Sequence, residues 1–305
     1  MKKRFLFALM LLMTGMGAIA CSGLPHNLSP RDKGNDSSPE GMDGTETSSG
    51  PGQQLDLTDF NSIQCSGAAD VFFTQAADYA AVAEDPDQML KRCEVKDNNL
   101  IIETKKNKGS VKKPRIFLWA PTLQQLSVSG VCTFTTEDLR ADQLTFNLSG
   151  VSNVRFRNLS CMELISHESG VCKVQGHIEG KRVELRCSGV SKDSLDIASD
   201  DLRLNASGSS KLQIIFKGSN VTVYNSGSTK VDMNVDCQQL TVSNSGVSKV
   251  TVSGTARNKT INNSGAARVD TSRLNENVHN LSVPVDSDGM VEAKLFPHRK
   301  AFAPI

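Results

Sequence analysis

The sequence predicts an all-β protein, a parallel β-solenoid of about eight coils, each about 19–20 residues long, preceded by a less regular β-rich cap. A Ser-Gly pair returns eight times at nearly constant intervals. Its glycines are Gly130, Gly150, Gly170, Gly189, Gly208, Gly227, Gly246 and Gly265. A fixed period of this length indicates a repeat architecture, in which each unit buries its apolar face only against the next unit.

Apolar and polar residues alternate on both sides of each Ser-Gly pair. Around Gly208, for example, the apolar positions are Leu202, Leu204, Leu212 and Ile214. A period of two is that of a strand with one buried face, and the units show no 3.6-residue helical period. Each repeat is therefore expected to hold at least two short strands. The glycine is expected at a corner, where φ is positive or the backbone lies close to its neighbour.

Residues 1–20 have the pattern of a lipoprotein signal peptide. A Lys-Lys-Arg start precedes an apolar run, and the run ends in Ala-Ile-Ala-Cys, with the cysteine at position 21. This ending is similar to the cleavage box of bacterial lipoproteins, so we predict that Cys21 becomes the lipidated N-terminus. An ordinary secretory signal cut near Ala20 remains the alternative. Both place the protein outside the cytoplasm, and the lipid anchor would hold it in the cell envelope.

The chain after Cys21 divides by composition into three parts. Residues 21–54 contain four prolines and many Ser, Gly, Asp and Thr, which predicts a disordered tether. Residues 55–128 are expected to form the β-rich cap, with strands at 79–83, 100–104 and 115–120, a helix or turn at 86–92 and a basic hairpin tip at 105–113. Residues 129–305 are expected to form the solenoid and a C-terminal cap. The net charge of +1 argues against nucleic acid as a partner.

Several segments in combination resemble a known family. They are Phe60-x-x-Ile63 to Val71, the Asn-Leu-Ile-Ile strand at 99–102, the Ala-Pro-x-Leu-x-x-Leu element at 120–126 and the serial Ser-Gly-Val-Ser-Lys-Val corners. Together they make nearly all of the chain after Leu55 similar to the auto-transporter adhesin head GIN domain, found in lipoproteins of Bacteroidetes. The resemblance implies a β-solenoid on a lipid anchor, an adhesin-like binding or scaffolding role, and an outer-membrane location.

One column of the repeat carries a cation in six successive units, three positions after each glycine. We call it the basic ladder; its members are Lys173, Lys192, Lys211, Lys230, Lys249 and Arg268. A solenoid would stack these side chains about 4.8 Å apart. One interpretation is a solvated edge that discourages sheet aggregation. The other is a stripe that attracts anionic glycan, lipopolysaccharide or another envelope protein.

A second column, directly before the Ser-Gly pair, holds Asn225, Asn244 and Asn263. Stacked amides can hydrogen-bond to one another along the axis of a coil, so we expect an internal stabilising ladder. The serine column is expected to satisfy backbone groups of the turns. No histidine or acid recurs beside it to activate a nucleophile.

The cysteines and histidines give little sign of a site. Seven cysteines remain besides Cys21, and we expect buried free thiols, with Cys65 and Cys93 as the one pair kept open for a disulfide. The histidines show no ligand spacing, so no metal site or cofactor is expected; they are His26, His167, His177, His279 and His298.

The alternative to a binding module is a β-solenoid polysaccharide lyase or hydrolase, which needs clustered carboxylates on one face. Four acids form the densest acidic group, Asp193, Asp196, Asp200 and Asp201. Asp193 replaces the usual apolar residue four positions after the glycine, and a local bulge of this coil would explain it. A groove that collects carboxylates and histidine from different coils would distinguish the enzyme from the binding module.

Overall fold

The computed structural model describes residues 52–85, 87–105 and 112–276, all of which fall within one compact unit, Ser48–Ile305. The described residues form strands and turns without a helix. The expected signal peptide, Cys21, almost all of the tether, the centre of the basic hairpin tip and the C-terminal cap lie outside them.

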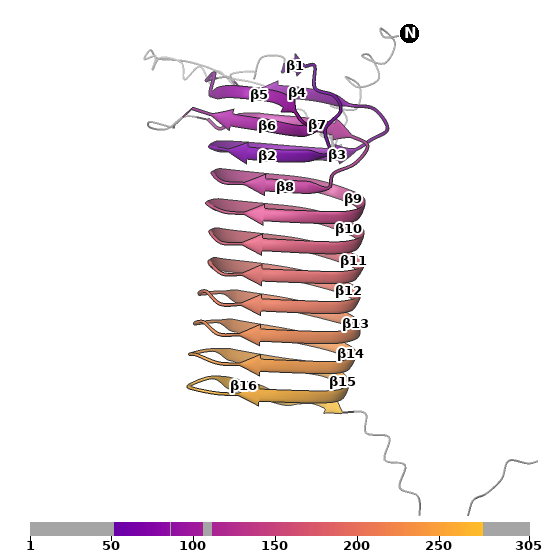
Figure 1. Cartoon of the computed structure of the whole chain (residues 1–305), viewed down its shortest axis with the longest axis vertical. Coiled ribbons are helices and arrows are strands. Elements are labelled where there is room, and N and C mark those ends of the chain that lie inside the picture. Colours follow the sequence, from indigo (N-terminus) through magenta and orange to yellow (C-terminus); the bar gives the residue numbers. More distant parts are fainter. Residues whose placement is uncertain (1–51, 86, 106–111, 277–305) are drawn as a thin grey trace, which may run out of the picture. The chain divides into compact units, whose positions relative to one another are not determined.

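The repeats form a parallel β-solenoid, as predicted (Figure 1). Its strands stack in chain order and pair in parallel: β9 (Val131–Leu148), β10 (Val151–Glu168), β11 (Val171–Cys187), β12 (Val190–Ala206), β13 (Lys211–Asn225), β14 (Lys230–Asn244), β15 (Lys249–Asn263) and β16 (Arg268–Glu276). The two short strands expected in each repeat are joined. One long strand bends back on itself in each coil from β9 to β15, and the Ser-Gly corner leads to the next (Figure 1).

The N-terminal part continues the same stack with a different connectivity. Its strands are β1 (Gln53–Leu55), β2 (Ser62–Ser66), β3 (Ala68–Gln75), β4 (Ala80–Glu84), β5 (Leu90–Lys96), β6 (Asn99–Thr104), β7 (Arg115–Ala120) and β8 (Gln125–Val128). The coil made by β2 and β3 turns at Gly67 and lies between β8/β9 and β6/β7. The Ser66-Gly67 pair, which repeats the Ser-Gly pattern of the later corners in the sequence, makes this an atypical first coil. The antiparallel strands β4 and β5 then cover the end of the stack, where open parallel edges would otherwise invite pairing with another chain.

Two details of this cap differ from the expectations drawn from the sequence. Gln53 and Gln54, assigned to the tether, belong to β1 and pair with β4. Of the segment expected as a helix or turn at 86–92, the described residues form a turn at 87–89 and then the first residues of β5, with no helix. Asp85 decides this, because its carboxylate accepts hydrogen bonds from the backbone N–H groups of Met89 and Leu90, both at 2.7 Å. These bonds hold the chain in a loop that feeds a strand.

Inward side chains of successive coils form one continuous apolar core. A representative column is Leu144, Leu164, Val183, Leu202, Val221 and Leu240, all at most 2 % exposed. Within this column, each side chain from Leu144 to Leu240 stacks on its equivalent in the adjacent coil. The core therefore has no centre, and its stability grows with each added coil.

The corner glycines satisfy both conditions that the sequence left open. Gly150, Gly246 and Gly265 have φ values between 71° and 77°, which favour glycine. Gly208 has no positive φ, yet a Cβ there would lie 1.9 Å from the carbonyl oxygen of Gly189 in the preceding coil. Glycine is required at Gly208 because two backbones meet.

The asparagine column is stacked in register, with Asn225 paired to Asn244 and Asn244 to Asn263. No hydrogen bond joins two of these three amides among the described residues. Asn244 instead accepts from the Ser248 hydroxyl and donates to the carbonyl of Arg268 at 3.4 Å. Asn225, equally buried, has no partner for either side-chain atom. The column thus contains one satisfied and one unsatisfied buried amide.

The seven cysteines of the described residues are free, including Cys65 and Cys93. Six are buried, as expected for free thiols that pack as small apolar side chains. Burial, with a smaller contribution from Cys65, raises the pKa of the Cys93 thiol to about 11. Cys93 is therefore a protonated and unreactive thiol at neutral pH.

We expect Gly208→Ala to lower the free energy of unfolding by more than about 2 kcal/mol, because the new methyl group meets a backbone carbonyl that cannot move alone. Ser209→Ala, at the exposed next position, should change it by less than about 0.5 kcal/mol. Chemical denaturation of the two variants checks this. Equal midpoints would contradict the close contact at the corner.

We expect Asn244→Ala to be more destabilising than Asn225→Ala by about 1 kcal/mol or more. The first removes satisfied hydrogen bonds, whereas the second removes a buried amide that makes none. The two residues share a column and are each 2 % exposed, so the lost volume is matched. Denaturation midpoints in the reverse order would show that the Asn225 amide is satisfied in solution.

Candidate functional site

The first half of each coil presents three outward columns to solvent, because alternate residues of a strand point to opposite faces. The basic ladder is the first column. Two positions further along lies a column of polar side chains, Gln175, Ser194, Gln213, Asp232 and Thr251, of which Thr251 is buried. The third column is His177, Asp196, Ile215, Asn234 and Ser253. The strand register thus aligns residues that lie one repeat apart in the chain.

The basic ladder is in register over five coils. Lys192, Lys211, Lys230, Lys249 and Arg268 are successive Cα partners, and all five are exposed. Lys173 is half-buried and pairs with Asn153, while its strand contact toward Lys192 is interrupted. Within the described residues, only Lys230 of the ladder has an ion pair, at 3.6 Å from Asp232. Most of the ladder charge is therefore open to a ligand.

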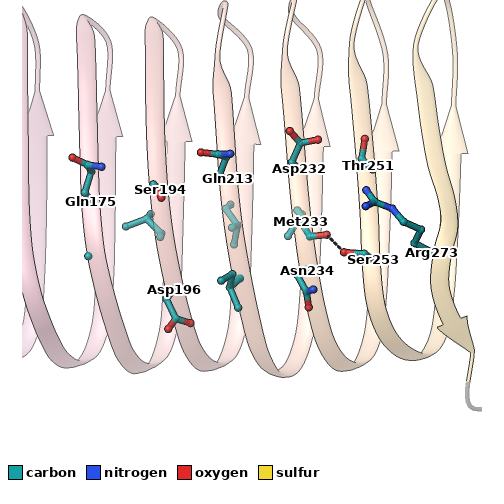
Figure 2. Close-up of a pocket in the computed structure, with 14 residues that line it drawn as sticks. Gln175, Ser194, Asp196, Gln213, Asp232, Met233, Asn234, Thr251, Ser253 and Arg273 are labelled. Carbon is teal, nitrogen blue, oxygen red and sulfur yellow. Dashed lines mark hydrogen bonds between the residues drawn. The ribbon is translucent and has the colours of Figure 1, made fainter.

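A groove of about 790 Å³ runs beside the ladder and crosses several coils (Figure 2). We call it the polar groove. Figure 2 shows one side chain of the polar column on each successive coil, with Arg273 at the far end: Gln175, Ser194, Gln213, Asp232 and Thr251. Ile215 adds an apolar surface that is 57 % exposed. The amides, hydroxyls and carboxylates of this groove offer hydrogen bonds along the solenoid axis, which suits a linear polar ligand.

The polar groove collects carboxylates and lies beside a histidine from another coil. The Nδ1 atom of His177 is 3.1 Å from the Asp196 carboxylate, and its Nε2 atom is 3.4 Å from Glu179. The contact between His177 and Asp196 was not predicted from the sequence, although the two residues lie one repeat apart in the chain. That spacing was the available signal.

The two carboxylates of the groove are poorly placed for glycoside hydrolysis. Asp196 and Asp232 lie two coils apart and in different columns, which puts their backbones about 12 Å apart. The carboxyl groups of paired glycosidase acids lie about 5–9.5 Å apart, so these two side chains would have to lean toward each other across the intervening coil. The groove is also open to water along its length. This arrangement suits binding better than hydrolysis.

The acidic group that the sequence singles out is divided by the fold. Asp196, Asp200 and Asp201 are exposed, whereas Asp193 points into the core and is 2 % exposed. The expected bulge is absent, since the offset between paired residues of β11 and β12 is the same before and after Asp193. Instead the backbone N–H of Val174 donates to the Asp193 carboxylate at 3.0 Å. Burial raises the pKa of Asp193 well above its ordinary value.

Three solved bacterial structures are similar to this chain. A crystal structure of a "putative adhesin" from Bacteroides fragilis aligns with a TM-score of 0.52 at 21% identity, covering 72% of this chain and 95% of that one. A "putative adhesin" from Parabacteroides merdae aligns at 0.49 and 14% identity, over 72% and 94%. A "putative lipid binding protein" from Parabacteroides distasonis aligns at 0.49 and 13%, over 72% and 95%. The first of these shows the same fold.

Curated proteins gave no match. In the part of the chain that the structure describes, no helix has the length and apolarity needed to cross a membrane.

One protein family matches residues 59–216 and 213–297, which is most of the chain. The resemblance inferred from the Ser-Gly corners is confirmed by this match. The chain belongs to the family described as "Putative auto-transporter adhesin, head GIN domain".

Proposed function

We propose that this protein is a lipid-anchored, non-enzymatic module of the cell envelope that binds an extended anionic glycan along the basic ladder. The observation that carries the proposal is the register of five exposed cations beside the polar groove. The ladder supplies charge, and the groove supplies hydrogen bonds for sugar hydroxyls. Membership of an adhesin family agrees with a role at the cell envelope.

The charge of the ladder favours a polymer over a small anion. Neighbouring cations about 4.8 Å apart repel one another by roughly 1 kcal/mol at the dielectric constant of water. A polyanion with regularly spaced carboxylates or phosphates relieves several of these repulsions at once. A small anion relieves one or two. The repeating surface therefore matches a repeating ligand.

The lipid anchor follows from the sequence around Cys21. A diacylglycerol thioether and an amide-linked acyl chain give stable membrane attachment, for which one chain is insufficient. The tether would let the solenoid reach a ligand away from the membrane surface. We place the anchored protein at the outer membrane.

A polysaccharide lyase or hydrolase is the second candidate, supported by the contact between His177 and Asp196 beside the polar groove. The wide separation of Asp196 and Asp232 argues against paired-acid hydrolysis. Incubation with polyuronates and detection of unsaturated or reducing ends tests this alternative directly.

We expect binding to polygalacturonate or lipopolysaccharide to weaken steeply between low and physiological ionic strength, where charges are screened over about 8 Å. The combined change Lys211→Gln, Lys230→Gln and Lys249→Gln should weaken it at least about tenfold, since three phosphate or carboxylate contacts are lost. Titration by calorimetry or biolayer interferometry measures both effects.

The matched control is Lys96→Gln, Lys181→Gln and Lys217→Gln, which removes the same charge from exposed positions outside the ladder. It should leave affinity within about twofold, because screened long-range attraction is all that it removes. If both triple variants bind the polyanion with the same affinity, or if the affinity does not change with ionic strength, the ladder is only a solvated edge.

We expect Cys21→Ser to move the protein from the membrane fraction to the soluble fraction of the envelope, because the lipid is the main source of membrane affinity. Fractionation at high salt, with immunoblotting, measures the distribution. Ser22→Ala is the control for a change near the cleavage site and should stay in the membrane. A processed Cys21→Ser protein that remains in the membrane pellet would disprove the anchor.

A further inference from the structure

Three neighbouring coils bury acids and a thiol inside the solenoid. Glu168, Cys187 and Asp193 are each at most 2 % exposed. Glu168 stands where the preceding coil has Leu148, and Asp193 stands where the following coil has Leu212. Apolar residues would satisfy the fold at these positions. The polar choice therefore needs a reason other than packing. We call these three residues the acid–thiol cluster.

The cluster brings its functional atoms together from three strands, β10, β11 and β12. One carboxylate oxygen from each acid and the Cys187 sulfur all lie within 4.8 Å of one another. Part of the cluster is already oriented by protein groups. The Ser166 hydroxyl donates to Glu168 Oε1 at 3.0 Å, and the Val174 N–H donates to Asp193 Oδ1 at 3.0 Å. Such hydrogen bonds fix carboxylates in the way that they fix metal ligands elsewhere.

Two buried oxygen atoms at the cluster have no hydrogen-bond partner. One is Glu168 Oε2, and the other is the hydroxyl of Ser191, a residue that is 1 % exposed. Burial raises the pKa of Glu168 and Cys187, and the nearby Ser191 hydroxyl offsets part of that rise, but Ser191 makes a well-formed hydrogen bond to neither. Buried polar atoms are rarely left without a partner. Both atoms belong to the same small volume, which points to a missing ligand.

We propose that Glu168, Cys187 and Asp193 bind a divalent transition metal, for which Zn²⁺ has the best-matched chemistry. A thiolate excludes Mg²⁺ and Ca²⁺, which take oxygen ligands and six or more of them. Zn²⁺ accepts sulfur and carboxylate oxygen in a four-coordinate site. The Ser191 hydroxyl is the neutral oxygen available for the fourth position. The site would be structural, because no open position faces solvent.

The distances and charges fit this assignment. Tetrahedral zinc with bonds of about 2.0–2.3 Å sets its ligand atoms about 3.5 Å apart, so small side-chain rotations suffice here. Burial raises the pKa of each of the three groups, which shows how costly their negative charges are without a cation. Metal binding would release protons from them and join three coils. Because the cluster is closed to solvent, the metal would enter as the coils fold.

The test uses the full chain, unfolded in guanidinium with reductant and chelator and then refolded with Co²⁺, Zn²⁺ or Mg²⁺. We expect one Co²⁺ to be retained per chain, with a thiolate-to-cobalt charge-transfer band in the near ultraviolet. Zn²⁺ should displace it and raise the melting temperature, and Mg²⁺ should do neither. Cys187→Ser should lose the band. Cys161→Ser, a buried cysteine on β10 outside the cluster, should keep it.

A double variant guards against a folding defect. Glu168→Leu with Asp193→Val restores apolar residues like those at Leu148 and Val174 in the neighbouring coils, so it should fold without metal and retain no Co²⁺. The metal content of the natural chain, measured after purification without chelator, is an independent test. The proposal is overturned if the refolded natural chain retains no Co²⁺, if the Cys187→Ser band is undiminished, or if the double variant binds equally well.

Discussion

The structure depends on the close approach of successive coils at the Ser-Gly corner. At Gly208 a single added carbon atom would meet the carbonyl oxygen of Gly189, so the two backbones are in contact with no room for a side chain. The same corner carries hydrogen bonds between coils, such as that from the Ser209 N–H to the Gly189 carbonyl at 3.0 Å. These contacts set the register between neighbouring strands. Without that register, neither the core nor the surface columns would form.

Because the register is constant, residues that lie one repeat apart in the chain stack into a column. The basic ladder follows from this rule, since Lys211, Lys230 and Lys249 lie one repeat apart in the chain and are adjacent in space. The contact between His177 and Asp196 follows from it as well. A solenoid surface can therefore present one chemical group at a regular spacing of about 4.8 Å. Such a surface matches a polymer whose own groups repeat, which is the basis of the proposed glycan binding.

Side chains inside the solenoid also stack in columns, but few of them are polar. Asn244 is accommodated because the Ser248 hydroxyl and the Arg268 carbonyl satisfy its amide. The acid–thiol cluster is the larger exception, because Glu168 and Asp193 bring two acids into one apolar stack. Burying such groups without compensation is costly. The column of Glu168 also holds the asparagines further along the solenoid, but charged side chains enter the core only at this cluster among the described residues.

The sequence by itself determined the solenoid, its period, the corner glycines and the order of the columns. It could do so because the recurrence of the Ser-Gly pair and the alternation of apolar residues are local patterns that translate directly into stacked strands. It also located the strands at 100–104 and 115–120 closely. The packing order of the N-terminal strands was decided only by the tertiary structure, since β2 and β3 insert between strands that come later in the chain. The proximity of Glu168, Cys187 and Asp193 was also decided only by the tertiary structure. Glu168 and Cys187 are Cα partners in one column, whereas Asp193 lies in another. Asp193 meets them because the corner folds the end of one coil over the start of the next, a contact that periodicity does not encode.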